Sequence, residues 1–110
     1  MSGQTYSIVW TETAARDLER LAAYLWSDSP LRAGDIVDRI ITRAESLHTS
    51  PFRGRMPPEL ETVGDRTWRE VMEPPWRIVY KVGADRVEIH GVLDGRRSLQ
   101  DILMERLLRG

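Results

Sequence analysis

Two apolar segments near the end of the chain, residues 75–82 and 86–93, are separated by a short Gly-Ala-Asp sequence. Both are rich in Val, Ile and aromatic residues, and a short turn with glycine between such segments is typical of a β-hairpin. The sequence therefore predicts two adjacent antiparallel strands, which restricts the fold to one that contains an antiparallel sheet.

Cations follow this predicted hairpin at defined positions. Arg77 and Lys81 are four residues apart and therefore lie on one face of their strand. Asp94 and Gly95 predict a turn, which is followed directly by Arg96 and Arg97. Cations held on a rigid strand suit a phosphate or an acidic partner, so these four side chains are candidates for binding.

Helical periodicity precedes the hairpin. Thr11 is a good N-cap for a first helix, and Ser29 followed by Pro30 predicts the start of a second helix after a tight connection. The predicted apolar face of the first helix consists of Ala14, Leu18, Leu21, Ala22 and Leu25, and that of the second of Ile36, Val37, Ile40, Ile41, Ala44 and Leu47. The sequence thus predicts an antiparallel helical hairpin.

The remaining segments complete the predicted order of elements. Residues 6–10 and 66–72 each predict a strand, and residues 50–65 predict an ordered loop because proline and glycine interrupt regular structure there. A C-terminal helix is expected to begin at Ser98, with Leu99, Ile102, Leu103 and Leu107 on its apolar face. The order β-α-α-β-β-β-α predicts an α+β fold, with two helices on one face of a small, mainly antiparallel sheet, in a single domain spanning 1–110.

Composition excludes several classes of protein. The formal net charge of -1 argues against bulk electrostatic binding of nucleic acid, and no sequence-specific DNA binding is expected of this chain alone. There is no cysteine, hence no disulfide, thiolate metal site or cysteine nucleophile. No apolar run is long enough for a membrane span, so we expect a cytoplasmic protein with no metal and no cofactor.

Short segments over nearly the whole chain together resemble one protein family by their order and spacing. They are the strand end near Trp10, Arg16-Asp17-Leu18, Ala44-Glu45-Ser46-Leu47, Pro51 with Gly54-Arg55, Arg69-Glu70-Val71, Trp76-Arg77-Ile78-Val79-Tyr80 and Leu93-Asp94-Gly95-Arg96-Arg97. In this arrangement they resemble the RelE/ParE toxin superfamily. The resemblance implies a bacterial toxin of a type II toxin-antitoxin module, neutralised by a cognate, ParD-like antitoxin.

The superfamily divides by target. RelE-like members enter the ribosomal A site and cleave messenger RNA, whereas ParE-like members poison DNA gyrase and are not nucleases. Cleavage through the RNA 2′-hydroxyl needs a base, cations that stabilise the phosphorane and an acid. Arg77 lies where RelE-like toxins carry a catalytic arginine, and His90 or Glu70 are the candidate general bases.

Other residues fit a nuclease poorly. Arginines in the loop before residue 66 are nearly cancelled by acidic residues, and no tyrosine or histidine follows Arg97. Strand alternation places His90 with Glu88 and Val92, on a face where it could lie near Arg77, although an exposed histidine without a role is the simpler interpretation. A strand glutamate beside Arg69, such as Glu70, is more often a surface ion-pair partner.

We therefore interpret the chain as a ParE-like inhibitor of DNA gyrase with no catalytic residues. Its contacts with the target or the antitoxin are expected at Arg77, Lys81, Arg96 and Arg97. One alternative is a RelE-like, ribosome-dependent endoribonuclease that uses Arg77 with His90 or Glu70. Another is a degenerate family member that binds antitoxin but is not toxic.

Overall fold

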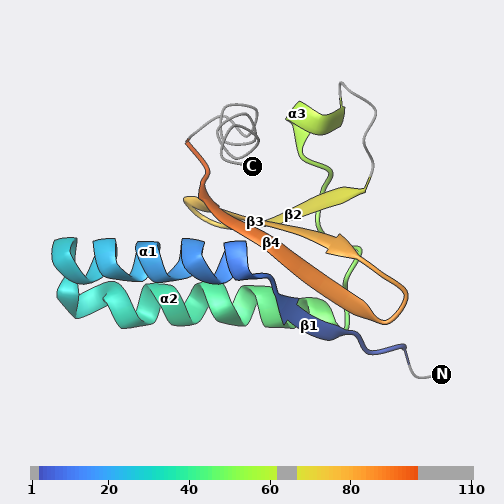
Figure 1. The fold of residues 1–110 in the computed structure, drawn as a ribbon, viewed down its shortest axis with the longest axis horizontal. Helices are drawn as coiled ribbons and strands as arrows, with labels where there is room; N and C mark the ends of the chain where they lie inside the picture. The colour runs from blue at the N-terminus through green and yellow to red at the C-terminus, as the bar shows by residue number, and fades with distance from the viewer. Residues whose placement is uncertain (1–2, 62–66, 97–110) are drawn as a thin grey trace.

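The computed structural model describes residues 3–61 and 67–96 of the 110-residue chain. Its elements are β1 (Ser7–Trp10), α1 (Glu12–Asp28), α2 (Pro30–Glu45), the short 3-10 helix η1 (Ser46–His48), α3 (Pro58–Glu61), β2 (Trp68–Glu73), β3 (Trp76–Val82) and β4 (Arg86–Asp94) (Figure 1). The predicted order up to the last strand is confirmed, and α3 is an addition inside the predicted loop. The predicted C-terminal helix from Ser98, and with it Arg97, lies outside the described residues.

The strands form one four-stranded sheet in the order β1-β4-β3-β2. β1 pairs with β4 in parallel, while the β2-β3 and β3-β4 pairs are antiparallel. The predicted hairpin is the β3-β4 pair, and its turn is closed by a 2.8 Å hydrogen bond from the Gly83 amide to the carbonyl of Arg86. The α+β fold class and the mainly antiparallel sheet are thus confirmed.

The caps of the two long helices are local features of the sequence. The Thr11 hydroxyl accepts a 3.2 Å hydrogen bond from the Ala14 amide, which satisfies one of the first free donors of α1. Ser29 lies between the helices with Pro30 at the start of α2, as predicted, but its side chain makes no capping bond. Its amide instead donates to the Leu25 carbonyl, 2.7 Å away, and ends α1.

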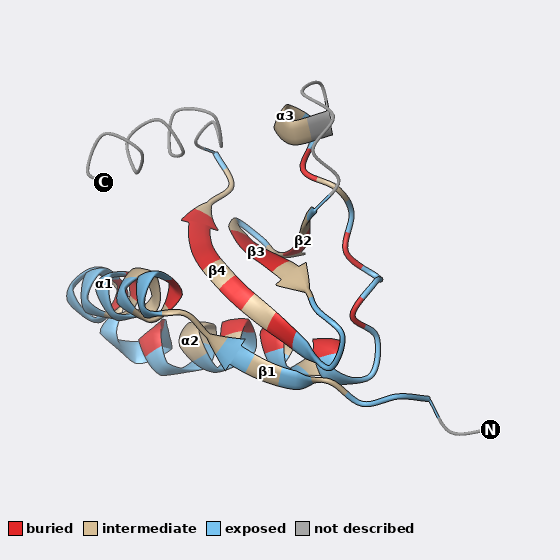
Figure 2. Ribbon diagram, turned by 45° about the vertical axis from the view of Figure 1, so that its right-hand side comes forward, coloured by how far each residue is buried: buried red, intermediate tan, exposed pale blue. Residues whose placement is uncertain are grey.

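Both long helices lie on one face of the sheet, and the main core fills the space between them (Figures 1 and 2). Buried positions face one another across this layer, as Figure 2 shows by colour on β3, β4 and the inner sides of the helices. The buried members of this core include Ala14, Leu21, Leu25, Ala33, Ile40, Ala44, Leu47, Val71, Ile78, Tyr80, Val87, Ile89 and Val92. Most of the predicted apolar helix faces therefore line one core.

A β-bulge changes the expected alternation along β4. Tyr80 pairs with Ile89 but the preceding Val79 pairs with Gly91, so His90 is the extra residue. Beyond the bulge the faces exchange, and Val92 is buried in the main core. The prediction that Val92 shares a face with His90 was therefore wrong, because simple alternation cannot anticipate an inserted residue.

The segment between η1 and β2 is pinned to the sheet by Tyr80. The Tyr80 hydroxyl donates to the Pro51 carbonyl at 2.7 Å and accepts from the Gly54 amide at 3.0 Å. Arg55 then pairs with Glu70 in an isolated antiparallel bridge along the outer edge of β2. The predicted ordered loop therefore covers a strand edge that would otherwise expose unpaired backbone groups.

The face of the sheet away from α1 and α2 has its own small cluster. Val79 and Leu93 are buried there, with Leu60 and Trp68 packed against them. Leu60 belongs to α3, which lies on the opposite side of the sheet from the long helices (Figure 1). None of the helices in the described part of the chain is long and apolar enough to cross a membrane.

Candidate functional site: an arginine-carboxylate cluster and an apolar groove

Arg77, the central predicted site residue, is the second residue of β3 and is buried, with a side chain only 6% exposed. Its Nε donates to Glu70 Oε1 at 2.7 Å, and its Nη2 lies 2.6 Å from the same oxygen. Nη1 and Nη2 also donate to the two carboxylate oxygens of Glu59, at 2.8 and 2.9 Å. Both edges of the guanidinium are therefore occupied by carboxylates.

Glu70 lies on β2 and its side chain is fully buried. Its second oxygen, Oε2, accepts a 2.8 Å hydrogen bond from Arg55 Nε, so both carboxylate oxygens are bonded to arginine. The interpretation of Glu70 as a surface ion-pair partner was wrong, since the loop that carries Arg55 and Glu59 covers it. To act as a general base, Glu70 would first have to break its hydrogen bonds to the charged side chains of Arg55 and Arg77.

We call Arg55, Glu59, Glu70 and Arg77 the Arg77 cluster. Hydrogen bonding to Glu59 is the largest cause that raises the pKa of Arg77 above its ordinary value; burial opposes the rise, and Glu70 adds to it. Two arginines and two glutamates cancel in formal charge. The cluster therefore holds Arg77 charged but leaves it without net attraction for a phosphate.

Gly95 forms one wall of the cluster, after the last residue of β4. Its amide donates to the Pro75 carbonyl at 2.6 Å, and a Cβ placed on it would lie 2.6 Å from that oxygen and 3.3 Å from Arg77 Cγ. Glycine is thus required for close approach of this turn to β3. The sequence indicated the turn, but not its contact with the buried arginine.

Lys81 and His90 lie together on the sheet face opposite the long helices. The Lys81 ammonium is 4.2 Å from the centre of the Trp68 ring, and the His90 ring meets Trp68 edge to face at 5.0 Å. His90 Nε2 is 3.1 Å from Glu88 Oε1, and this bond is the main cause that lowers the pKa of Glu88.

His90 lies on β4, where it is inserted opposite the Val79–Tyr80 step of β3, two to three residues along the strand from Arg77. Its ring contacts Trp68 and its Nε2 bonds Glu88, and both of these residues pair with Lys81 in the sheet. The carboxylates that bond Arg77 are Glu59 and Glu70, so these contacts of Arg77 and of His90 involve different residues.

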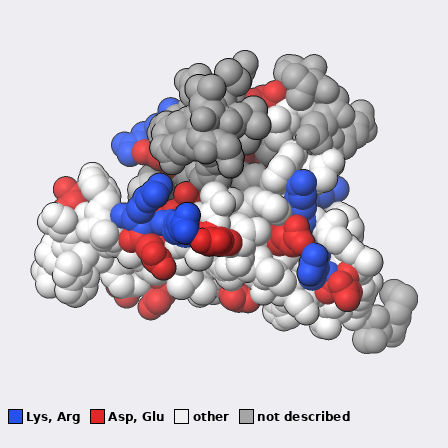
Figure 3. All heavy atoms as spheres, in the orientation of Figure 1, with Lys and Arg blue, Asp and Glu red and all other residues white. Residues whose placement is uncertain are grey.

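Arg96 follows Gly95 at the surface, with 76% of its side chain exposed. Its Nε and Nη2 donate to the two carboxylate oxygens of Asp94 at 2.9 and 2.7 Å, which raises the pKa of Arg96. Among the predicted contacts in the described part of the chain, Lys81 and Arg96 are at least partly exposed. Cations and anions alternate on the face drawn in Figure 3.

An apolar groove of about 410 Å³ lies between α1, α2 and the end of β1. It is lined by Trp10, Ala15, Leu18, Glu19, Ala22, Val37 and Ile41. Several of these residues were assigned to the apolar helix faces, and two of them, Leu18 and Val37, both pack against the main core and line the groove. Such a groove suits the apolar side chains of a protein partner.

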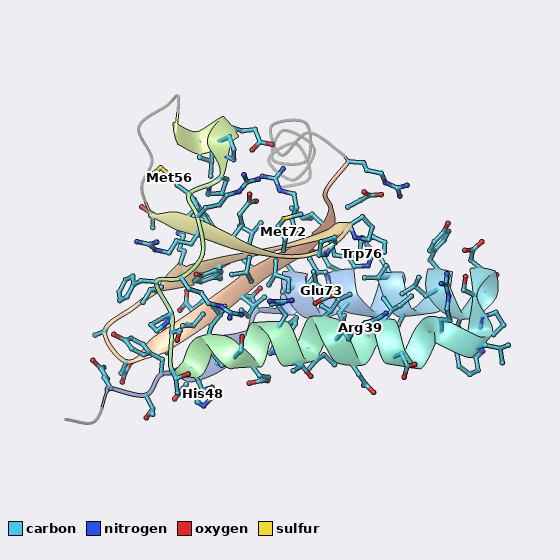
Figure 4. All side chains as sticks on the ribbon, turned by 180° about the vertical axis from the view of Figure 1, so that it is seen from behind. Arg39, His48, Met56, Met72, Glu73 and Trp76 are labelled. Carbon is cyan, nitrogen blue, oxygen red and sulfur yellow. The ribbon has the colours of Figure 1, made fainter. Side chains whose placement is uncertain are left out.

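A second groove, of about 520 Å³, lies on the other side of α2, next to the end of β2. Arg39 and Glu73 line it and are labelled in Figure 4. Arg43 donates to Glu73 Oε1 at 3.2 and 3.3 Å across it. Arginines and acidic residues are mixed along this groove, so its charge favours neither an anion nor a cation.

Among the described residues, no cluster of His, Asp and Glu is arranged to hold a metal ion.

A fold with two helices on one face of a β1-β4-β3-β2 sheet is also found in two solved structures. A chain of the chromosomal ParDE toxin-antitoxin system of P. aeruginosa superposes with a TM-score of 0.68 at 20% identity, covering 82% of this chain and 96% of that chain. The toxin-antitoxin complex RelBE2 of Mycobacterium tuberculosis gives a TM-score of 0.59 at 22% identity, covering 83% and 92%. These similarities establish the fold.

Sequence comparison identifies the family. Residues 8–99 match the model of the ParE toxin of the type II toxin-antitoxin system parDE. Toxin RelE2 of Caulobacter vibrioides is 37% identical over 83 residues, covering 74% of this chain and 86% of that protein. The putative toxin Y4kP of Sinorhizobium fredii is 30% identical over 96 residues, covering 87% and 95%. The protein is a type II toxin, and the chain belongs to the ParE toxin family within the RelE/ParE superfamily.

Proposed function

We propose that this toxin arrests growth by binding and inhibiting DNA gyrase, and that it has no nuclease activity of its own. The observation that carries the proposal is the Arg77 cluster. Arg77 is the cation on which RNA cleavage would depend, and its two edges are bonded to Glu59 and Glu70. A guanidinium whose Nε, Nη1 and Nη2 all bond carboxylates is poorly placed to stabilise a phosphorane.

The position of His90 supports the same proposal. Its ring packs on Trp68 and its Nε2 bonds Glu88, two residues that pair with Lys81, which favours a packing role for His90 over that of a general base beside Arg77. Inhibition by binding needs only an accessible surface, and Lys81, Arg96 and Arg97 remain the cations that we expect to contact gyrase. The ParE family match agrees with gyrase as the target.

The partner that neutralises the toxin is expected to be its cognate, ParD-like antitoxin. The two structural neighbours are described as a ParDE system and a RelBE2 complex, each with a toxin and an antitoxin. We propose that apolar antitoxin side chains fill the groove formed by Leu18, Ala22 and Val37. Burial of apolar surface there would supply binding free energy without any charge pairing.

The target is tested with purified protein in two assays. We expect it to inhibit supercoiling of relaxed plasmid by gyrase and to leave messenger RNA intact on programmed ribosomes. Lys81→Ala and Arg96→Ala should weaken the inhibition, whereas Arg16→Ala, which removes an exposed cation of α1, should not. In cells, thymidine incorporation should fall before methionine incorporation.

The RelE-like alternative remains because one relative carries the name Toxin RelE2. It predicts the reverse result, which is ribosome-dependent cleavage that is lost in Arg77→Lys and His90→Gln while supercoiling is unaffected. A protein that is inactive in both assays but still binds its antitoxin would instead be a degenerate member of the family.

A further inference from the structure

The two carboxylates bound to Arg77 differ in how they are held. Glu70 comes from the middle of β2 and its side chain is fully buried. Glu59 comes from α3, a helix of four residues within the loop, and its side chain is 25% exposed. Glu70 therefore belongs to the rigid sheet, whereas Glu59 is the outer occupant of the arginine.

α3 is a single helical turn within the loop that covers the edge of β2. The loop is pinned earlier in the chain, where Tyr80 bonds Gly54 and Arg55 pairs with Glu70. Beyond that point, Leu60 packs in the small cluster with Val79, and Glu59 bonds Arg77. A single turn of helix has little stability of its own, and the Glu59 side chain is partly exposed, so exchange of its carboxylate would require a rearrangement of α3 but not of the strands.

We propose that Arg77 is a masked carboxylate-binding site, in which Glu59 occupies the place that an acidic side chain of a protein partner takes. Glu59 already shows the geometry, since its two oxygens lie 2.8 and 2.9 Å from two nitrogens of Arg77. This paired arrangement is the one that guanidinium and carboxylate groups prefer. An incoming Asp or Glu side chain would restore the same bonds.

Charge favours a protein partner over a nucleic acid. With Glu59 bound, the Arg77 cluster is neutral, and without it the cluster carries one net positive charge next to the buried Glu70. One carboxylate restores neutrality. Nucleic acid binding instead requires neutralisation of several phosphates, whereas this chain has a formal net charge of -1.

Exchange of carboxylates would add specificity more than affinity. Arg77 makes similar bonds to Glu59 and to an incoming carboxylate, so the exchange adds little binding free energy. It does add selectivity, because a partner without a correctly placed acidic residue would not displace Glu59. Glu59 acts as a tethered competitor that weakens the binding of any free carboxylate. The inference does not depend on gyrase being the target, because gyrase inhibition is measured separately.

The test measures acetate binding to the full-length protein, by titration at constant ionic strength with NMR detection of the arginine Nε–H groups. Removal of the competitor in Glu59→Ala should lower the dissociation constant for acetate about tenfold relative to the wild type. Glu59→Gln should also lower the dissociation constant for acetate. Because glutamine keeps the size of glutamate, this variant shows that the effect comes from the lost charge and not from a smaller side chain. Glu12→Ala, which removes a carboxylate from an exposed ion pair of α1, should behave like the wild type.

Two further measurements make the result decisive. Arg77→Lys in the Glu59→Ala background keeps the charge but loses the paired geometry, and should abolish the gain. Inorganic phosphate, titrated in parallel, should bind Glu59→Ala more weakly than acetate does. The proposal is overturned if wild type and Glu59→Ala bind acetate equally, if the gain survives Arg77→Lys, or if phosphate binds more tightly than acetate.

Discussion

Glu70 is the single residue whose burial most changes the interpretation of this protein. It is bonded by Arg77 on one oxygen and by Arg55 on the other, with no exposed side-chain surface. A buried charge that loses its partner is far more costly than an exposed one. The cluster that blocks Arg77 from catalysis is therefore also a structural element of the sheet.

We predict that Glu70→Gln destabilises the protein by about 3–5 kcal/mol, because Arg77 loses a buried counter-charge. Urea unfolding, monitored by circular dichroism, measures this loss in the free energy of unfolding. Glu73→Gln on the same strand removes a partly exposed ion pair with Arg43 and should cost about 1 kcal/mol or less. Equal costs for the two variants would show that the Arg77 cluster has no special structural weight.

Tyr80 leads to a prediction about pH. Burial is the largest cause that raises the pKa of the Tyr80 phenol above its ordinary value. The folded state therefore keeps the phenolic proton more tightly than the unfolded state does. This contribution to stability is complete below pH about 10 and is lost as the pH rises through the folded-state pKa.

The absorbance of phenolate during an alkaline titration measures this directly. We expect a late-titrating phenol that is absent from Tyr80→Phe. The same variant leaves the Gly54 amide and the Pro51 carbonyl without their partner, at a cost of about 1–3 kcal/mol. An unchanged titration curve in Tyr80→Phe would contradict the assignment.

At the scale of single elements, α1 is tied to the sheet through its cap. The Thr11 hydroxyl accepts from the Ala14 amide and also donates to the Ile89 carbonyl of β4 at 2.8 Å. We predict that Thr11→Ala lowers the free energy of unfolding by about 1–2 kcal/mol. Thr13→Ala, an exposed change in the first turn, should have a much smaller effect in the same chemical denaturation experiment.

Gly54 limits how closely the loop approaches the sheet. A Cβ at this position would lie 2.3 Å from the Tyr80 hydroxyl oxygen and 2.7 Å from the Glu70 carbonyl. We predict that Gly54→Ala costs about 1–3 kcal/mol through overpacking. Gly34→Ala in α2, where a Cβ meets nothing within 4 Å, should instead stabilise by about 0.5–1 kcal/mol. Thermal unfolding of both variants tests whether the signs are opposite.

At the scale of the whole molecule, the groove between α1, α2 and β1 is the surface that we expect the antitoxin to occupy. Ala22→Glu places a carboxylate in this groove, while Ala23→Glu places one on the exposed side of α1. We predict that Ala22→Glu weakens antitoxin binding at least about tenfold, since burial of an unpaired charge is costly. Calorimetric titration with the cognate antitoxin measures the dissociation constant of each variant. Equal binding by the two variants would exclude this groove as the antitoxin-binding surface.

Much of the fold could be predicted from the sequence because the signals are local. Helix periodicity, the Thr11 cap, the Ser29-Pro30 boundary and the turn at Gly83 each depend on neighbours within a few residues. The predicted strands were correct in order and type. The bulge at His90 was missed, because an inserted residue leaves no mark in a two-residue alternation.

The candidate site was predicted less well. Arg77 and Lys81 were placed on one face of β3, and the contacts of both side chains agree with that placement. Their surroundings could not be predicted, because Glu59 and Arg55 approach the sheet only when the loop folds over the edge of β2. The exposed cation expected at Arg77 is instead a buried and neutralised one.

The sequence by itself determined the two long helices, the four strands and their order, the family and the residues that carry charge. Only the tertiary structure decided which of those charges are available to a partner. The physical reason is that secondary structure depends on short-range periodicity and capping, whereas burial and ion pairing join residues far apart in the chain, as Glu59 and Arg77 are.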